Sequence, residues 1–471
     1  MDLLGIGKPG IQAAQLSGIL IGVASAFLGW GLLLKLKEEG VERLFPNWKI
    51  IIQTDNTSPL PWILVGFLIT FFGLFTVPST MNPENRFHYF NRFLPEIVPI
   101  GRDLMFSTNN ILAWLVSGAN PYEMPYHVYP PLYTVVFAPL VLLSYPARFY
   151  FMTTLTFVCI VILTMIMPTL MKAERRHSIH VFFFLTVIIS YGMLFEYERG
   201  QFNIVAFTLA LTAVYLFHYQ PSFRHFAYLL FSISIHLKLY PAIFILMFIK
   251  NWRDWKGNLL RFAGIGIFNI ALLFSVGISM FMSFMNSIGN YTSDIWSRPY
   301  NLSIRSFVYA LANKEIVSFS DSVAAWIQKN LLGLEFFFLV FFGLCLLIIV
   351  VKAYRNNEHA INFDLLMILT IGALIIPSVS IDYKLPLLAL PLSLALSQRS
   401  IQGTGVKKFI IILLVIFASA AYTVTLFPFI DKPTILANNL PMLVVILISI
   451  TLLNILDGSA LSQTKKNQWQ L

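Results

Sequence analysis

Five groups of ionisable side chains interrupt an otherwise apolar chain, and they are the places where chemistry could be done. They are "GRDLMFSTNNILAWLVSGANPYEMPYHVYPPLY" (101–133), "FEYERGQFN" (195–203), "SIHLKLYPA" (234–242), "DIWSRPYNLSIRSF" (294–307) and "SVSIDYKLP" (378–386). An ionisable residue in or beside a bilayer is costly, so it usually serves a function and needs a partner. A cation such as Lys238, central in its apolar run, requires an anion, and anion binding is the first chemistry to expect.

Each group also has a structural interpretation. Interfacial Lys and Arg side chains often extend to lipid headgroups, and Glu198 with Arg199 could be a simple surface pair. Lys238 is harder to explain in this way, because it lies in mid-span close to Pro241, which frees a backbone carbonyl. None of the groups presents His, Asp or Glu at metal-ligand spacing, so no metal is predicted.

The elements that position these groups are membrane helices. Of the 471 residues, 57% are hydrophobic and 11% are charged, against about 25% charged in soluble domains. We predict an all-α polytopic membrane protein, with 1–471 as a single integral membrane domain of about 12–13 helices, because lipid otherwise admits only a barrel and the runs lack barrel alternation. The candidate spans are 12–35, 61–79, 129–145, 147–170, 179–196, 202–218, 225–249, 258–285, 331–352, 361–380, 384–397, 408–427 and 438–456.

The net charge of +10 is gathered in short loops that flank the spans, such as 250–261 and 352–358. This pattern indicates positive-inside loops in the cytoplasm and not nucleic-acid binding. Two large loops, 80–128 and 286–330, then fall on the non-cytoplasmic face. The charges between 129 and 250 do not alternate cleanly, so bent or re-entrant segments are expected there.

The stretch 101–133 predicts a defined local structure. Apolar residues recur at roughly helical spacing after Asp103, which is typical of an amphipathic helix on the membrane interface. Gly118 and Pro121 mark its end, and Pro130 and Pro131 suit the first turn of a new span. Motifs for nucleotide hydrolysis, dinucleotide binding, zinc proteolysis and α/β-hydrolases are absent from the sequence.

Several short motifs follow one another in a fixed order over about 100–400. Their residues are Asp103, Gly118, Asn120, Pro121, Tyr122, Tyr129, Pro130, Pro131, Leu132, Pro139, Leu140, Gly200, Gln201, Asn203, Lys238, Pro241, Asn301, Ser303 and Arg305. This pattern of order and spacing resembles that of the polytopic glycosyltransferases of the C superfamily (GT-C), and within it the family 87 mannosyltransferase-like proteins. One departure concerns the late Asp382, which is followed by Lys384 where family members often carry a His.

This resemblance implies an inverting glycosyltransferase that takes a hexose or pentose, with mannose favoured, from a polyprenyl-phosphate sugar. The acceptor would be a lipid or glycan hydroxyl on the non-cytoplasmic face, in what we expect to be a bacterial plasma membrane. Asp103 would be the catalytic base, with Glu123 as the alternative, and no metal or other cofactor is expected. The donor phosphate would be held by Lys238, Arg305, Lys384, Arg199 and His236. The sugar and acceptor would be bound by Tyr122, Asn120, Tyr129, Gln201, Asn203, Asn301 and His127.

Two other classes remain open from the sequence. A transporter or flippase of lipid-linked sugars would show inverted repeats and paired broken helices, and only one clear break, at Pro241, is visible. A polysaccharide polymerase or ligase would also carry a large external loop, but would depend on Arg-rich loops instead of an early Asp.

Overall fold

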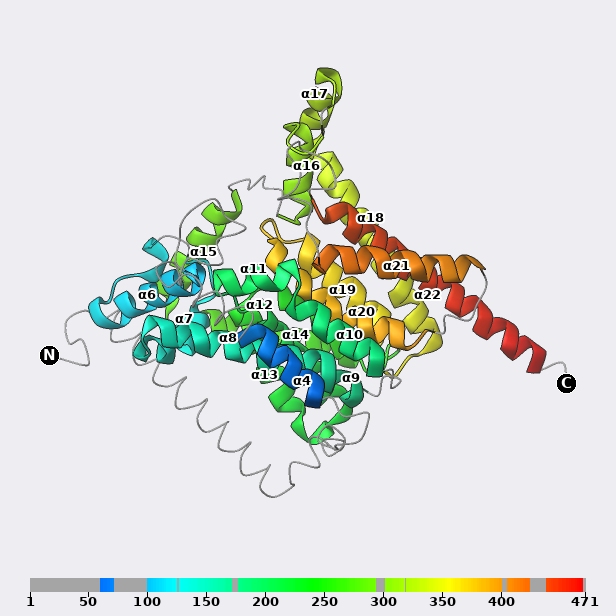
Figure 1. The fold of residues 1–471 in the computed structure, drawn as a ribbon, viewed down its shortest axis with the longest axis horizontal. Coiled ribbons are helices and arrows are strands. Elements are labelled where there is room, and N and C mark those ends of the chain that lie inside the picture. The colour runs from blue at the N-terminus through cyan, green and yellow to red at the C-terminus, as the bar shows by residue number, and fades with distance from the viewer. Residues whose placement is uncertain are drawn as a thin grey trace. The chain divides into compact units, whose positions relative to one another are not determined.

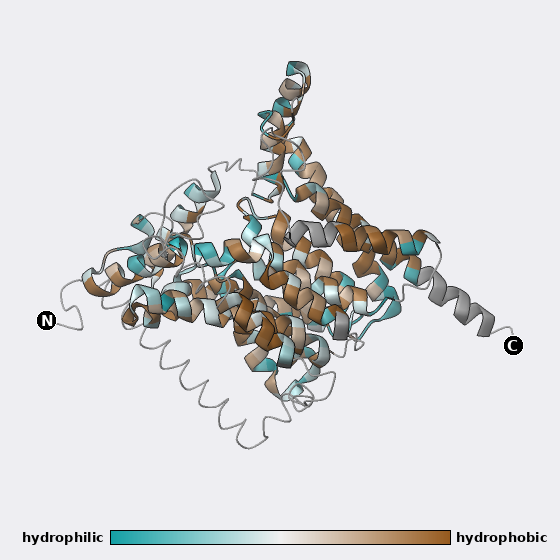
Figure 2. Ribbon diagram, in the orientation of Figure 1, coloured by the Kyte–Doolittle hydropathy of each residue, from teal (hydrophilic) through white to brown (hydrophobic). Residues whose placement is uncertain are grey.

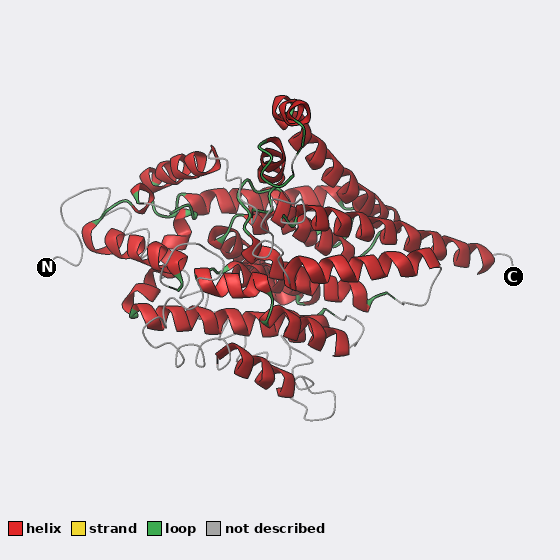
Figure 3. Cartoon of the chain, turned by 45° about the horizontal axis from the view of Figure 1, so that its top comes forward, coloured by secondary structure: helices red, strands yellow, loops and turns green. Residues whose placement is uncertain are grey.

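The computed structural model describes residues 60–71, 100–124, 127–171, 177–293, 301–317, 319–399, 405–423 and 438–468. Every regular element among them is a helix, as Figure 3 shows, so the predicted all-α class is confirmed. Apolar residues run along most of these helices (Figure 2). The predicted span 12–35 lies outside the described residues.

The chain divides into two compact units. The first comprises 1–170, 196–242 and 259–294. Its elements are α-helices, which Figure 1 labels, and short 3-10 or π segments, which are named η. They are α4 (Leu60–Phe67), α6 (Arg102–Ser117), η3 (Pro121–Glu123), α7 (Pro131–Phe137), η4 (Ala138–Leu142), α8 (Tyr145–Val161), η5 (Ile162–Ile166), α9 (Met167–Leu170), α12 (Asn203–Tyr219), η6 (Pro221–Phe223), α13 (Arg224–Leu237), α14 (Trp255–Leu273) and α15 (Ile278–Ser293).

The second unit comprises 171–195, 243–258 and 295–471. It shares α11 (Tyr191–Arg199), η7 (Tyr240–Phe248) and the start of α14 with the first unit. Its own elements are α10 (His177–Ile188), α16 (Ile304–Ala312), α17 (Asp321–Lys329), α18 (Leu331–Asn356), α19 (Phe363–Ile375), η8 (Asp382–Leu388), α20 (Ala389–Ser397), α21 (Gly405–Thr423) and α22 (Leu440–Gln468).

Three described helical segments are long and apolar enough to cross a membrane: 145–170, 331–356 and 440–457. Counting each bent helix pair as one span raises the number to five. Helix α18 carries large apolar side chains, such as Leu332 and Phe336, exposed along its length, as a lipid-facing helix requires. The total of 12–13 spans stays a prediction. Several of the predicted spans, such as α12 and α19, are apolar helices shorter than the 18 residues expected of a full crossing.

Three predicted continuous spans are broken, and the breaks have local causes. The prediction that 258–285 forms one continuous span is wrong, because α14 and α15 meet at 100°. The bend lies beside Gly277, whose φ is +98°. The span 225–249 ends its α-helix at Leu237, since the ring of Pro241 would clash with the carbonyl four residues earlier. A 47° bend between α10 and α11 confirms that the region 129–250 contains bent segments.

Candidate active site

Asp103 and three other polar side chains of the first unit form one hydrogen-bonded group. Nη2 of Arg199 lies 2.5 Å from Oδ1 of Asp103, and its Nε donates to Oδ2 at 3.0 Å. The amide nitrogen of Gln201 also donates to Oδ2, and Oε1 of Gln201 accepts from Nζ of Lys238 at 2.7 Å. The structure therefore brings together four of the residues that the sequence nominated, from three separate segments of the chain.

Asp103 reaches this group because α6 begins against the turn that follows α11. Gly101, with φ +77°, precedes α6, and its N–H donates to the carbonyl of Glu198 at 2.7 Å. Gly200 has φ +63°, and a Cβ there would lie 2.9 Å from the Cα of Gly101. Only glycine adopts such a φ without strain and leaves room for this approach. Two glycines thus place the base candidate beside Arg199 and Gln201.

Lys238 is held at the end of α13, in an extended conformation with φ −147° and ψ 136°. Its ammonium lies 4.3 Å from the ring centre of Phe202 and 4.7 Å from that of Tyr129. Ring faces attract a cation, most strongly where water is excluded. The break in the helix and these two rings together direct the ammonium toward Gln201.

The aromatic side chains near Lys238 continue into α7. Tyr133 stacks on Phe202 with ring centres 5.2 Å apart, and its hydroxyl donates to Oγ of Ser107 at 2.8 Å. Tyr122 donates its hydroxyl to the carbonyl of Tyr129 at 2.6 Å. The start of α7 is therefore fixed against α6, the helix that carries Asp103.

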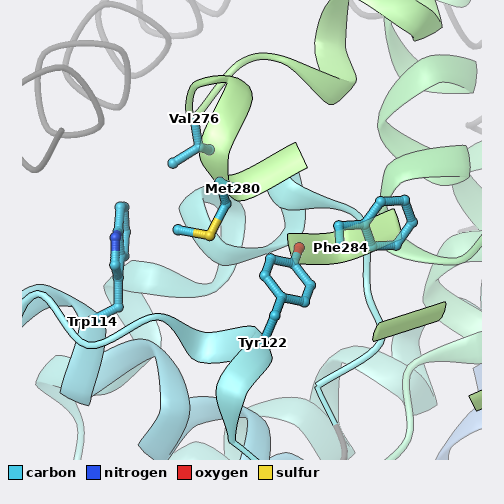
Figure 4. Packing of buried hydrophobic residues seen from close by; sticks show 5 residues of the cluster. All are labelled: Trp114, Tyr122, Val276, Met280 and Phe284. Carbon is cyan, nitrogen blue, oxygen red and sulfur yellow. The ribbon is translucent and has the colours of Figure 1, made fainter. Parts of the chain in front are cut away.

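Helix α15 is fastened to the end of the first large loop. Figure 4 shows an apolar cluster formed by Trp114, Tyr122, Val276, Met280 and Phe284. Polar contacts reinforce it: Nδ2 of Asn120 donates to Oγ of Ser283 at 2.8 Å. Oγ of Ser287 donates to the carbonyl of His127 at 2.9 Å. Helix α15, which carries the first residues of the second large loop, therefore contacts the end of the first large loop within this unit.

His127 is buried in the same region, between the rings of Tyr122 and Tyr133. Its Nε2 lies 3.4 Å from the hydroxyl of Thr134. Burial lowers the pKa of His127 to about 4 and raises the pKa of the Tyr122 phenol. His127 is therefore a neutral imidazole, and Tyr122 a neutral phenol, at physiological pH.

Other nominated residues of this unit lie apart from the Asp103 group. Glu123 is exposed and accepts from Nδ2 of Asn120 at 3.2 Å. Nε2 of His236 lies 3.2 Å from the carbonyl of Asn269 in α14. Asn203 is fully buried and directs its Nδ2 to Glu196 at 2.8 Å.

Asn301, Arg305 and Lys384 belong to the second unit. Oδ1 of Asn301 accepts from the N–H of Ser380 at 2.9 Å, and Nζ of Lys384 donates to Oγ of Ser380 at 3.3 Å. Arg305 lies in the first turn of α16. Asn301 and Lys384 thus meet at Ser380, in the polar segment 378–384 of that unit.

Glu198, considered above as a surface partner of Arg199, is buried. Glu196 and Asp382 are two further buried carboxylates that received no role from the sequence. Glu196 in the first unit accepts from the main chain of Asn203. Asp382 in the second accepts from the hydroxyl of Tyr191 at 3.1 Å and from Asn439 at 3.2 Å. Both carboxylates belong to the charged groups identified in the sequence. Their hydrogen-bond partners lie on other elements or beyond a turn, so the sequence did not reveal these contacts. Among the described residues no set of three His, Cys, Asp or Glu side chains could hold a metal ion.

A carboxylate paired with Arg199 and linked through Gln201 to Lys238, in an all-helical membrane chain, is suited to a membrane enzyme that acts on an anionic substrate. A sequence model of glycosyltransferase family 87 matches residues 126–377, more than half of the chain, and the chain belongs to this family. The protein is therefore a glycosyltransferase. The matched region contains Arg199, Gln201 and Lys238 and begins after Asp103. No curated protein and no solved structure matches the chain.

Proposed function

We propose that the protein is an inverting glycosyltransferase that uses a polyprenyl-phosphate sugar as its donor, mannose being favoured among hexoses and pentoses. The observation that carries this proposal is the pairing of Asp103 with Arg199 and, through Gln201, with Lys238. Transfer from a sugar phosphate needs a base for the acceptor proton and cations for the departing phosphate. This group supplies both kinds of side chain in one place.

In the proposed step the acceptor hydroxyl oxygen attacks the anomeric carbon from the face opposite the phosphate. The new glycosidic bond forms as the bond between the anomeric carbon and the phosphate oxygen breaks, with inversion at that carbon. Asp103 takes the proton of the acceptor hydroxyl, and the phosphate leaves with the electron pair of the broken bond. Arg199 and Lys238 stabilise the charge that develops on the leaving phosphate.

Asp103 accepts three N–H bonds from Arg199 and Gln201. These contacts occupy both oxygens of the carboxylate. We expect the donor phosphate to compete for Arg199, since the guanidinium fork fits phosphate as well as carboxylate. Binding of the donor would then free one oxygen of Asp103 for the acceptor hydroxyl.

The remaining nominated residues keep the roles proposed from the sequence. Tyr129, beside Lys238, is proposed as a sugar or acceptor contact, together with Tyr122, Asn120 and His127 at the end of the first large loop. Asn203 and Asn301 stay proposed as sugar or acceptor contacts, and Arg305, Lys384 and His236 stay proposed as phosphate contacts. Glu123, which is exposed, stays the alternative base. Two cations beside a monophosphate leaving group make a metal unnecessary in this scheme.

The site would lie on the non-cytoplasmic face of the membrane, because the Lys- and Arg-rich loops indicate that 80–128 is external. The acceptor is proposed to be a lipid-linked or glycan hydroxyl. The test is a transfer assay with purified protein in lipid vesicles, using polyprenyl-phosphate mannose and a lipid-linked glycan acceptor. Transfer with an inverted anomeric linkage supports the proposal. Movement of the donor lipid across the vesicle membrane without transfer would support a flippase instead.

A further inference from the structure

Glu196 is a fully buried carboxylate at the end of α11, and it bonds the residues that begin α12. Its Oε1 accepts from the N–H of Asn203 at 2.7 Å and from that of Ile204 at 3.3 Å. Its Oε2 accepts from Nδ2 of Asn203 at 2.8 Å. The first N–H groups of a helix lack partners within the helix and carry partial positive charge, so a carboxylate there is stabilising.

The backbone carbonyl of Glu196 also accepts a hydrogen bond from the turn 199–202, which joins α11 to α12. The N–H of Gln201 donates to the carbonyl of Glu196 at 3.0 Å, and that of Gly200 donates to Tyr197 at 3.0 Å. With Gly200 at φ +63°, this is the hydrogen-bond pattern of a Schellman helix end. One residue therefore bonds both sides of the turn 199–202.

That turn carries Arg199 and Gln201, whose side chains donate to Asp103. Glu196 also attracts the ammonium of Lys238 electrostatically, and Tyr240, two residues after Lys238, donates to the carbonyl of Asn203 at 2.7 Å. The segments that carry Arg199, Gln201 and Lys238 therefore all interact with Glu196 or with Asn203.

We propose that Glu196 is a positioning residue for sugar transfer: it holds the turn 199–202 so that Arg199 and Gln201 reach Asp103. This inference rests on the proposed function. It concerns a residue that touches neither Asp103 nor, in the scheme above, the substrate.

Glu196→Gln is an isosteric variant that removes the charge of the side chain but can keep its hydrogen bonds. In Glu196→Gln, Oε1 still accepts from the two N–H groups. Oδ1 of Asn203 has no hydrogen-bond partner among the described residues, so that carboxamide can turn over and accept from the new Nε2. Glu196→Ala removes all three side-chain bonds. Asn362→Ala is a matched control, because Asn362 caps α19 through Leu365 in the other unit.

The experiment measures kcat per folded molecule, the midpoint of thermal unfolding and amide hydrogen exchange for these variants. We expect Glu196→Ala to lose about 100-fold in kcat, as misplacement of catalytic groups by an ångström can do, and to speed exchange at Asn203 and Ile204. Glu196→Gln should retain most of the activity, and Asn362→Ala should lower the unfolding midpoint with little change in kcat. In a Gln201→Ala background, Glu196→Ala should cost much less than it does alone.

The proposal is overturned if Glu196→Ala keeps the parent kcat, if Glu196→Gln is as impaired as Glu196→Ala, or if the two substitutions are additive. Unchanged exchange at Asn203 and Ile204 in Glu196→Ala would overturn it as well, and this readout needs no substrate. Failure of the proposed donor chemistry appears separately, as absence of transfer by the parent protein.

Discussion

Nζ of Lys238 lies 2.7 Å from Oε1 of Gln201, and the amide nitrogen of the same side chain donates to Asp103. A single carboxamide therefore links a cation and a carboxylate that lie far apart in the first unit's sequence. Its two ends cannot be exchanged, because the oxygen must face the ammonium and the nitrogen must face the carboxylate.

Replacement of Gln201 by Leu should reduce kcat for sugar transfer by about tenfold to 100-fold, because both Asp103 and Lys238 lose an orienting partner. Gln201→Glu should be at least as impaired, since a second carboxylate would face Asp103. Initial rates in lipid vesicles measure the effect. The exposed Gln328 of α17 provides the control Gln328→Leu, and equal rates for Gln201→Leu and this control would contradict the assignment.

Arg199→Gln should raise the KM for the donor by about tenfold, because a bidentate partner for the phosphate is lost. Arg199→Lys should recover only part of this loss, since a lysine cannot make the paired contacts of a guanidinium. Donor titrations at fixed acceptor concentration measure both. A donor KM in Arg199→Gln equal to that of the parent would show that Arg199 serves Asp103 alone.

Gly200→Ala should destabilise the protein by about 1–3 kcal/mol, the usual cost of forcing a residue with a side chain into a left-handed conformation. The new Cβ would also lie 2.9 Å from Gly101 and from Leu104. Thermal unfolding in detergent measures the change. Gly264→Ala is the control, because a Cβ in that helix meets no described atom within 4 Å. An equal midpoint for the two variants would refute the close approach of Gly200 to Gly101.

Much of this site was predictable from the sequence because the chain is a membrane protein. Polar residues are rare there, so Asp103, Arg199, Gln201 and Lys238 were conspicuous, and the structure brings them together. Local signals were also sufficient for α6 and for the start of α7, where Gly118 and Pro131 lie at the predicted helix boundaries.

The long-range relationships were not predictable. Nothing in the sequence shows that Gly101 lies against Gly200, since this contact depends on two helix ends far apart in the chain. Hydropathy could not reveal the 100° bend before α15, because both sides of the bend are apolar. In the sequence Glu196 is one of several charges in the group 195–203. The positioning role proposed for it depends on its bonds to Asn203 across the turn.

His127 gives the fold a pH dependence. Its pKa is about 4 in the folded protein against 6.5 for an ordinary histidine, because burial disfavours the charged ring. Between these values the unfolded chain binds more protons, so stability falls as the pH is lowered from about 6.5 to about 4, by a total of about 3 kcal/mol. His127→Gln should flatten this fall in unfolding midpoints measured across that range. The exposed His359 supplies the control His359→Gln, and an identical slope in all three proteins would contradict the prediction.

The proposed mechanism depends on Asp103 removing the proton of the acceptor hydroxyl. Sugar transfer from polyprenyl-phosphate mannose is therefore compared for the parent, Asp103→Asn and Asp321→Asn, whose aspartate side chain is 98% exposed on α17. We expect Asp103→Asn to lose about 10²–10⁴-fold in kcat, the usual contribution of a general base, while it still binds polyprenyl phosphate and Asp321→Asn behaves as the parent. Transfer by Asp103→Asn at the parent rate would show that Asp103 is not the base.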